Sequence, residues 1–332
     1  MTQLILDRAG CLREPAEFLA PVGARERSLP RLVGFLAAGA AAALAAALVV
    51  GLAIVVLAAL QIARTRGVGV LQGIDLALNP GAAHRPLLSY WFELAVAGLA
   101  TYAAALAILG LAMRFYRRPA ASFLTIAPRF RWRLVATGFL IGLAAVGAAL
   151  IAQLLVAHEP LKPPLLQPGE ALPARLGYLG LAAACLYLAA LAEEIVFRGV
   201  LLQLGAAFTR NLPLLLAVNG VIFSLAHFDP DPSSFAIRAL MGAGWAWIAL
   251  RTGGVETTAG VHLANNLIVG LFVMPISFAP KAAENVDLAA VLIEFATVLV
   301  CVGAVEVLVR RRDRAAVARL AALDPATESP GG

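Results

Sequence analysis

The sequence predicts an all-α membrane protein: a polytopic bundle of about eight transmembrane helices around an intramembrane cavity. Composition is the first reason. Hydrophobic residues make up 61% of the 332 residues and charged residues only 14%, and mean hydropathy is +0.86. Soluble domains use roughly 45–50% apolar residues. The second reason is that the apolar residues form long runs, and about 20 such residues are needed for a helix to cross a bilayer.

Each apolar run is interpreted as one helix. The first is too long for the core of a signal peptide and lacks a small-residue cleavage pattern, so a retained, tilted helix is expected. The fifth and sixth are short, and Pro213, Pro230 and Pro232 bound the fifth, which favours broken or half-depth helices there. The predicted spans are 32–63, 87–113, 134–157, 176–204, 212–228, 234–250, 255–274 and 288–309.

The basic residues orient the predicted bundle. With the N-terminus inside, Lys and Arg on the cytoplasmic side outnumber those outside by roughly three to one, so both termini are expected in the cytoplasm. Abundant Ala and Arg with only two Lys indicate a bacterial protein from a GC-rich genome, and hence the inner (plasma) membrane. The net charge of +6 does not indicate nucleic-acid binding, because no basic patch is interleaved with aromatic residues.

The fourth span carries the most informative motif, in which Glu193 and Glu194 are followed by Arg198. An ionisable side chain at the centre of a membrane helix costs roughly 2.5–3.5 kcal/mol. These three are therefore expected to face a protein interior or a watery cavity. Glu194 and Arg198 are one helical turn apart and can form an ion pair. Glu193 points about 100° away and lacks such a cation, which suits a general base.

Two later spans contribute further polar side chains. His227 ends the fifth span, and the seventh contains His262 and Asn266. Because His262 and Asn266 are four residues apart, they share a helix face. They can present two donors to one point, as stabilisation of an oxyanion requires. His227 is expected to complete the activation of a water molecule by Glu193.

Structural explanations also exist for these residues, because Glu–Arg pairs, His and Asn in membranes often hold helices together. Asn219 is interpreted as a packing residue, and Gly138 with Gly142 as a site of close helix contact. Trp245 and Trp247, near the end of the sixth span, are interpreted as an interfacial anchor.

Three motifs taken together resemble the CPBP family, the CAAX-protease and bacteriocin-processing intramembrane endopeptidases related to the Ras-converting CAAX endopeptidase. The motifs are Glu193-Glu194-x-x-x-Arg198, Phe223-x-x-x-His227 and His262-x-x-x-Asn266. The resemblance covers roughly residues 175–275, under a third of the chain. It implies a conical helix bundle around a membrane-embedded cavity, and endoproteolysis of a membrane-associated peptide or protein.

The resemblance also implies roles by position. Glu193 resembles the general base, and His227 its partner on the catalytic water. His262 and Asn266 resemble the oxyanion-stabilising pair. The supporting pair is Glu194 with Arg198.

Metal dependence is an open alternative in the sequence. Glu193, His227 and His262 have the right atoms for a Zn²⁺ site with an open water position. The His-Glu-x-x-His signature is absent. A metal-free mechanism without a cofactor is preferred, because Asn266 is a poor zinc ligand and a good oxyanion donor.

The expected organisation has five segments: a cytoplasmic N-terminal segment, three transmembrane helices with loops, a catalytic core, a last transmembrane helix and a disordered cytoplasmic tail. They are 1–31, 32–174, 175–275, 276–312 and 313–332. The expected partners are the lipid bilayer and a membrane-associated peptide or protein substrate. Two other functions stay open: a non-catalytic scaffold or immunity protein of the same fold, and a transporter, which the lack of inverted repeats disfavours.

Overall fold

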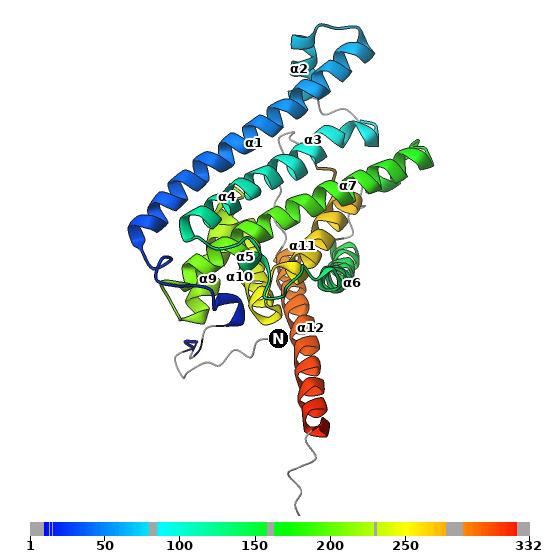
Figure 1. Cartoon of the computed structure of the whole chain (residues 1–332). Helices are drawn as coiled ribbons and strands as arrows, with labels where there is room; N and C mark the ends of the chain where they lie inside the picture. The colour runs from blue at the N-terminus through cyan, green and yellow to red at the C-terminus, as the bar shows by residue number, and fades with distance from the viewer. Residues whose placement is uncertain are drawn as a thin grey trace, which may run out of the picture.

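The chain folds into a bundle of helices (Figure 1). The computed structural model describes residues 10–12, 14, 16–79, 85–157, 163–228, 231–276 and 288–323. Within these ranges, 6 helices are long and apolar enough to cross a membrane. They are Leu29–Arg66, Leu87–Tyr116, Trp132–Val156, Leu172–Ala206, Pro232–Thr252 and Leu288–Ala315. The predicted all-α polytopic membrane bundle is confirmed.

Several of these spans are built from more than one helical element. The α-helices are α1 (Leu29–Arg66), α2 (Val70–Leu78), α3 (Trp91–Ala95), α4 (Thr101–Tyr116), α5 (Ala121–Leu124), α6 (Trp132–Ala157), α7 (Leu172–Glu194), α8 (Leu202–Ala206), α9 (Leu212–Leu225), α10 (Pro232–Thr252), α11 (Glu256–Ile268) and α12 (Leu288–Leu323). Wider π-helical turns are η3 (Val96–Ala100), η5 (Ile195–Leu201) and η6 (Val269–Val273). Tighter 3₁₀ turns are η1 (Glu17–Leu19), η2 (Leu87–Tyr90) and η4 (Pro164–Leu166).

The helix lengths confirm part of the predicted pattern. The fifth predicted span is the 14-residue α9, too short to cross a bilayer, as expected. The seventh is the 13-residue α11 followed by η6, so the count of eight full spans is not reached among the described residues. The sixth was expected to be short, and that expectation is wrong. α10 has 21 residues, because Asp231 caps its first turn and it continues to the left-handed Gly253.

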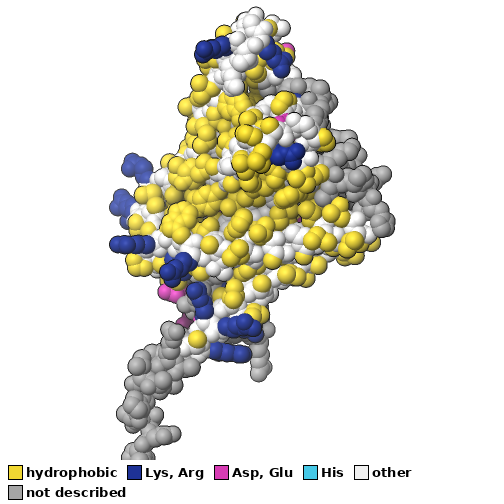
Figure 2. Space-filling model, turned by 90° about the vertical axis from the view of Figure 1, so that its right-hand side faces the viewer, with side chains coloured by type: hydrophobic (Ala, Val, Ile, Leu, Met, Phe, Trp, Pro, Cys, Tyr) yellow, Lys and Arg dark blue, Asp and Glu magenta, His cyan; other side chains and the backbone are white. Residues whose placement is uncertain are grey.

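Exposed hydrophobic side chains cover the long helices. Leu48, Leu140 and Leu299, on three different helices, are 62%, 63% and 63% exposed. Figure 2 shows a broad hydrophobic face with basic side chains along its edges. Soluble monomers rarely expose apolar patches above about 300–600 Å². The chain is therefore an integral membrane protein.

The interior of the bundle is organised around α11, which packs closely against α6. A methyl group added at Gly138 or Gly142 of α6 would meet the backbone of α11, and one added at Gly260 of α11 would meet the backbone of α6. The close helix contact predicted for Gly138 and Gly142 is confirmed. Glycine removes the side chains that would keep the two backbones apart. The fit holds α11 in the centre of the protein, where nearly all its residues are buried.

Two parts of the structure differ from the predicted segment boundaries. α12 continues to Leu323 and projects below the other helices (Figure 1), although a disordered tail was expected from residue 313. Residues 324–332 of that tail lie outside the described residues. The loop after α1 contains α2, which was not predicted. Gly73 of α2 lies directly against the backbone of Ala59, so α2 folds back onto α1.

Candidate active site

The fourth span places a buried ion pair at the centre of the bundle. Glu194 ends α7, and Arg198 lies in η5. Both side chains are fully buried, and Arg198 Nη1 lies 3.2 Å from Glu194 Oε1. The Arg198 guanidinium also donates a 3.3 Å hydrogen bond to the carbonyl of Gly242 and lies 4.4 Å from the centre of the Phe223 ring. The ion pair predicted from the four-residue spacing is confirmed. Since buried charges are costly, these contacts are what make the position tolerable.

His262 joins this pair from α11. Its Nδ1 lies 3.0 Å from Glu194 Oε1, and the residue is only 4% exposed. The ring stacks on the indole of Trp245, with centroids 4.7 Å apart and planes at 29°. The interpretation of Trp245 as an interfacial anchor is wrong, because this side chain is 2% exposed and packs in the core. A tryptophan near a span end looks the same in sequence whether it faces lipid headgroups or a neighbouring helix.

His227 approaches from the end of α9. Its Nδ1 lies 2.8 Å from the carbonyl oxygen of Phe223, which fixes the ring orientation. Its Nε2 lies 3.8 Å from Oε2 of Glu193. α9 ends at Leu225, and His227 follows two residues later, beside Glu193.

Glu193 is the point at which both imidazoles converge. Its Oε2 lies 3.8 Å from Nε2 of His227 and 3.7 Å from Nε2 of His262. These separations exceed a direct hydrogen bond but suit a bridging water. Among the described residues, this buried oxygen has no hydrogen-bond partner. The Glu193 and His227 side chains are 22% and 30% exposed, so the site is reachable from outside, whereas Glu194 is sealed.

Asn266 is the sixth residue predicted for the site, and it lies one turn after His262 on α11. It is partly buried, and its Oδ1 accepts a weak 3.4 Å hydrogen bond from Asn265. Within the described part of the chain, its amide makes no hydrogen bond to the other five residues. The structure thus brings together Glu193, Glu194, Arg198, His227 and His262, and Asn266 lies one turn from His262 on α11.

An aromatic wall around these groups was not recognised in the sequence. Phe223 contacts Phe197 and Trp245 edge to face, at centroid distances of 5.1 and 5.9 Å. It also touches the rings of His227 and His262, at 4.8 and 6.1 Å. The available signal was the spacing of Phe223 and His227, which puts both on one helix face. The wall lowers the polarity around the ion pair and so strengthens its electrostatics.

The described residues contain no group of three or more His, Cys, Asp or Glu side chains arranged to hold a metal ion. The zinc alternative for Glu193, His227 and His262 stays a prediction.

The fold and these contacts define a polytopic membrane protein with a buried polar site at its centre. Residues 175–268 match the family model described as Rce1-like, a type II CAAX prenyl endopeptidase family. All six predicted site residues lie in this segment. The resemblance predicted from the motifs is thereby confirmed for this part of the chain.

A bacterial protein is also similar. "Uncharacterized protein YyaK" from Bacillus subtilis (strain 168) is 31% identical over 173 residues, which cover 49% of this chain and 56% of that protein. The chain thus matches about half the length of this curated relative. No solved structure matches the chain.

Proposed function

We propose that the protein is an intramembrane endopeptidase that hydrolyses a peptide bond of a membrane-associated peptide or protein. The observation that carries this proposal is the unpaired Oε2 of Glu193, which faces Nε2 of both His227 and His262 at 3.8 and 3.7 Å. A buried oxygen without a partner is expensive to keep. Its position next to two imidazoles is explained if a reacting water binds there.

In this mechanism, Glu193 and His227 hold the water. Since Nδ1 of His227 faces a carbonyl oxygen, it carries hydrogen, and Nε2 of the neutral ring accepts from the water. Glu193 accepts the other hydrogen and takes that proton as the water oxygen attacks the carbonyl carbon. The protonated carboxyl then donates to the amide nitrogen as the C–N bond breaks. The products are a new carboxylate and a new amine.

His262 and Asn266 stabilise the oxyanion in this proposal. With Nδ1 of His262 donating to Glu194, Nε2 acts as a donor when the ring is an imidazolium. Glu194 and Arg198 are then positioning residues, which fix the orientation of His262 without touching the substrate.

The test is cleavage of a membrane-peptide library by purified full-length protein in detergent, with and without a strong chelator. Glu193→Gln should lower the rate by about 10²–10⁴-fold. Glu294→Gln should leave it unchanged, since Glu294 is another carboxylate within a span but bonds Gln153 instead. Cleavage that survives chelation supports the metal-free mechanism. Loss on chelation, restored by Zn²⁺, would contradict it. Cleavage that persists in Glu193→Gln would refute the role of Glu193.

A further inference from the structure

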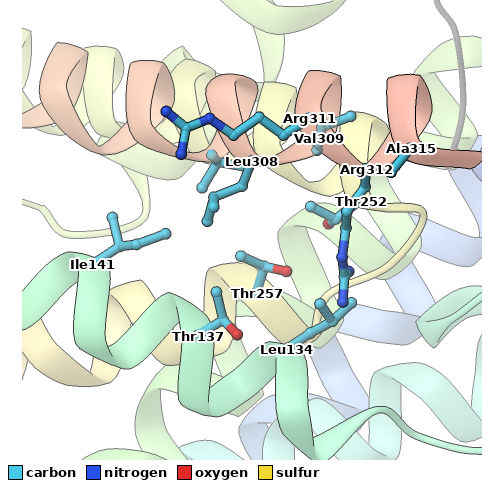
Figure 3. A pocket seen from close by; sticks show the side chains of 11 residues that line it. Leu134, Thr137, Ile141, Thr252, Thr257, Leu308, Val309, Arg311, Arg312 and Ala315 are labelled. Atoms are coloured by element: carbon cyan, nitrogen blue, oxygen red, sulfur yellow. The ribbon is translucent and has the colours of Figure 1, made fainter.

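A hollow lies away from the candidate active site, between α6, α11 and α12. It has a volume of about 320 Å³ and combines apolar, hydroxyl and basic side chains. Figure 3 shows Arg312 reaching from α12 towards Leu134 on α6, with Thr137 and Thr257 on the opposite wall.

One hydroxyl in this cavity has no partner. Thr257 is 2% exposed, and its Oγ1 makes no hydrogen bond to any described residue. The neighbouring hydroxyls do have acceptors. Thr252 donates to the backbone carbonyl of Ile248 at 2.9 Å, and Thr137 donates to the backbone carbonyl of Arg133 at 2.8 Å. Leaving a buried hydroxyl unpaired costs stability. Thr257 therefore indicates a polar ligand.

Two arginines indicate the charge of that ligand. Arg311 and Arg312 both line the cavity, and neither forms an ion pair within the part of the chain that the structure describes. The preceding Arg310 contrasts with them, because it pairs with Glu306 at 2.8 Å. The Arg312 guanidinium reaches into the cavity, whereas the Arg311 side chain runs along α12 with its guanidinium directed away from that of Arg312 (Figure 3). A guanidinium without an ion-pair partner suits a phosphate, whose oxygens match its planar donors.

An apolar groove borders the cavity. From Ile141, which lines both, a hollow of about 640 Å³ runs between α6 and α12 and is lined mainly by Ala, Ile, Leu and Val. Gln153 of α6 bonds Glu294 of α12 at 2.9 Å, and this contact ties the two helices together beyond the groove. The groove lies within the membrane-spanning parts of both helices. Because its lining is apolar and it lies at the depth of the bilayer, a lipid acyl chain suits this groove.

We propose that the cavity and groove together bind one anionic phospholipid. Its phosphate binds the Arg312 guanidinium with Arg311 at the rim of the cavity, the Thr257 hydroxyl donates to a phosphate or ester oxygen, and an acyl chain occupies the groove. A free phosphate leaves the groove unused, and a lipid without net charge leaves the two guanidinium charges unbalanced. This site is independent of the proposed peptidase activity.

The test uses full-length protein in detergent, titrated with phosphatidylglycerol, phosphatidylcholine or soluble glycerol phosphate, with bound molecules counted by native mass spectrometry. Wild type should prefer phosphatidylglycerol over phosphatidylcholine by about fivefold for each arginine, or roughly 25-fold. Glycerol phosphate should not bind measurably. The double variant Arg311→Gln/Arg312→Gln should lose the preference. Arg133→Gln/Arg314→Gln removes the same charge from exposed positions outside the cavity and should keep it.

The groove and the hydroxyl are tested separately. Ala148→Phe fills the groove and should weaken phosphatidylglycerol binding, whereas Ala136→Phe, exposed on the same helix outside it, should not. Thr257→Val keeps both arginines and should weaken binding severalfold. Equal loss in both arginine double variants would reduce the effect to diffuse surface charge and overturn the proposal. Glycerol phosphate binding as tightly as the lipid would also overturn it, by showing a plain anion site.

Discussion

Glu193 and Glu194 are adjacent in sequence but have opposite surroundings. Glu194 is sealed between Arg198 and His262, whereas Glu193 is partly exposed and unpaired. Helical spacing was enough to predict the Glu194–Arg198 pair. It was not enough to predict that His262 contacts both glutamates, because His262 is 68 residues from Glu194. Periodicity identifies the face of a helix and not the helix it meets.

This asymmetry predicts opposite effects of two neighbouring substitutions. Glu194→Gln leaves the buried Arg198 without its counter-ion and should destabilise the protein by about 3–5 kcal/mol. Glu193→Gln removes an unpaired carboxylate and should leave stability unchanged or slightly raised, while cleavage is lost. Thermal unfolding of both variants in the same detergent measures the difference. Equal losses of stability would show that the two carboxylates are not distinct.

The buried position of Trp245 gives a second prediction at the scale of one side chain. Trp245→Ala should cost about 3–5 kcal/mol, because it opens a cavity beside the His262 ring. Trp247→Ala should cost less, since Trp247 is only partly buried. Thermal unfolding of the two variants checks this order. A larger loss in Trp247→Ala would contradict it.

At the scale of helices, proline and glycine positions were the informative signals. Pro213 and Pro230 correctly indicated a short α9, which ends two residues before His227. The spacing of Gly138 and Gly142 correctly indicated close packing, but the partner α11 came only from the structure. α10 was misjudged, because the length of an apolar run ignores the Asp231 cap that extends the helix.

The packing of α6 against α11 predicts a strong effect from one methyl group. In Gly138→Ala the new Cβ meets the carbonyl oxygen of Thr257, so α11 must shift and carry His262 with it. A loss of about 1–3 kcal/mol in stability is expected from such overpacking, together with a fall in cleavage rate. Gly110→Ala is the control, because nothing lies within 4 Å of a Cβ there. It should stabilise α4 by up to about 1 kcal/mol.

For the whole molecule, composition was sufficient to predict the class but not the details at its ends. Long apolar runs marked the membrane spans, since the bilayer fixes their length. The N-terminal segment carried no such pattern, yet Leu12 and Phe18 are buried against the ends of α9 and α10. Arg118 holds the same segment by a 3.1 Å contact with Glu26. Such contacts depend on distant parts of the chain and leave no local signature.

The charge distribution predicts that both ends of the chain face the cytoplasm. A fluorescent protein fused to either terminus should fluoresce, and alkaline phosphatase fused to either should be inactive, because each works on only one side of a bacterial inner membrane. Active phosphatase at one terminus would mean an odd number of crossings. The bias in Lys and Arg makes the cytoplasmic arrangement the expected one.

The unequal burial of the paired glutamates also has an evolutionary consequence. A descendant of this chain can lose Glu193 and still fold, because no other described side chain depends on that carboxylate for a hydrogen bond. Loss of Glu194 instead leaves the buried Arg198 without its counter-ion and His262 Nδ1 without its partner. Selection for folding alone therefore preserves Glu194 but allows Glu193 to change. Homologues that keep the second glutamate but vary at the first are expected to be inactive descendants that retain the architecture.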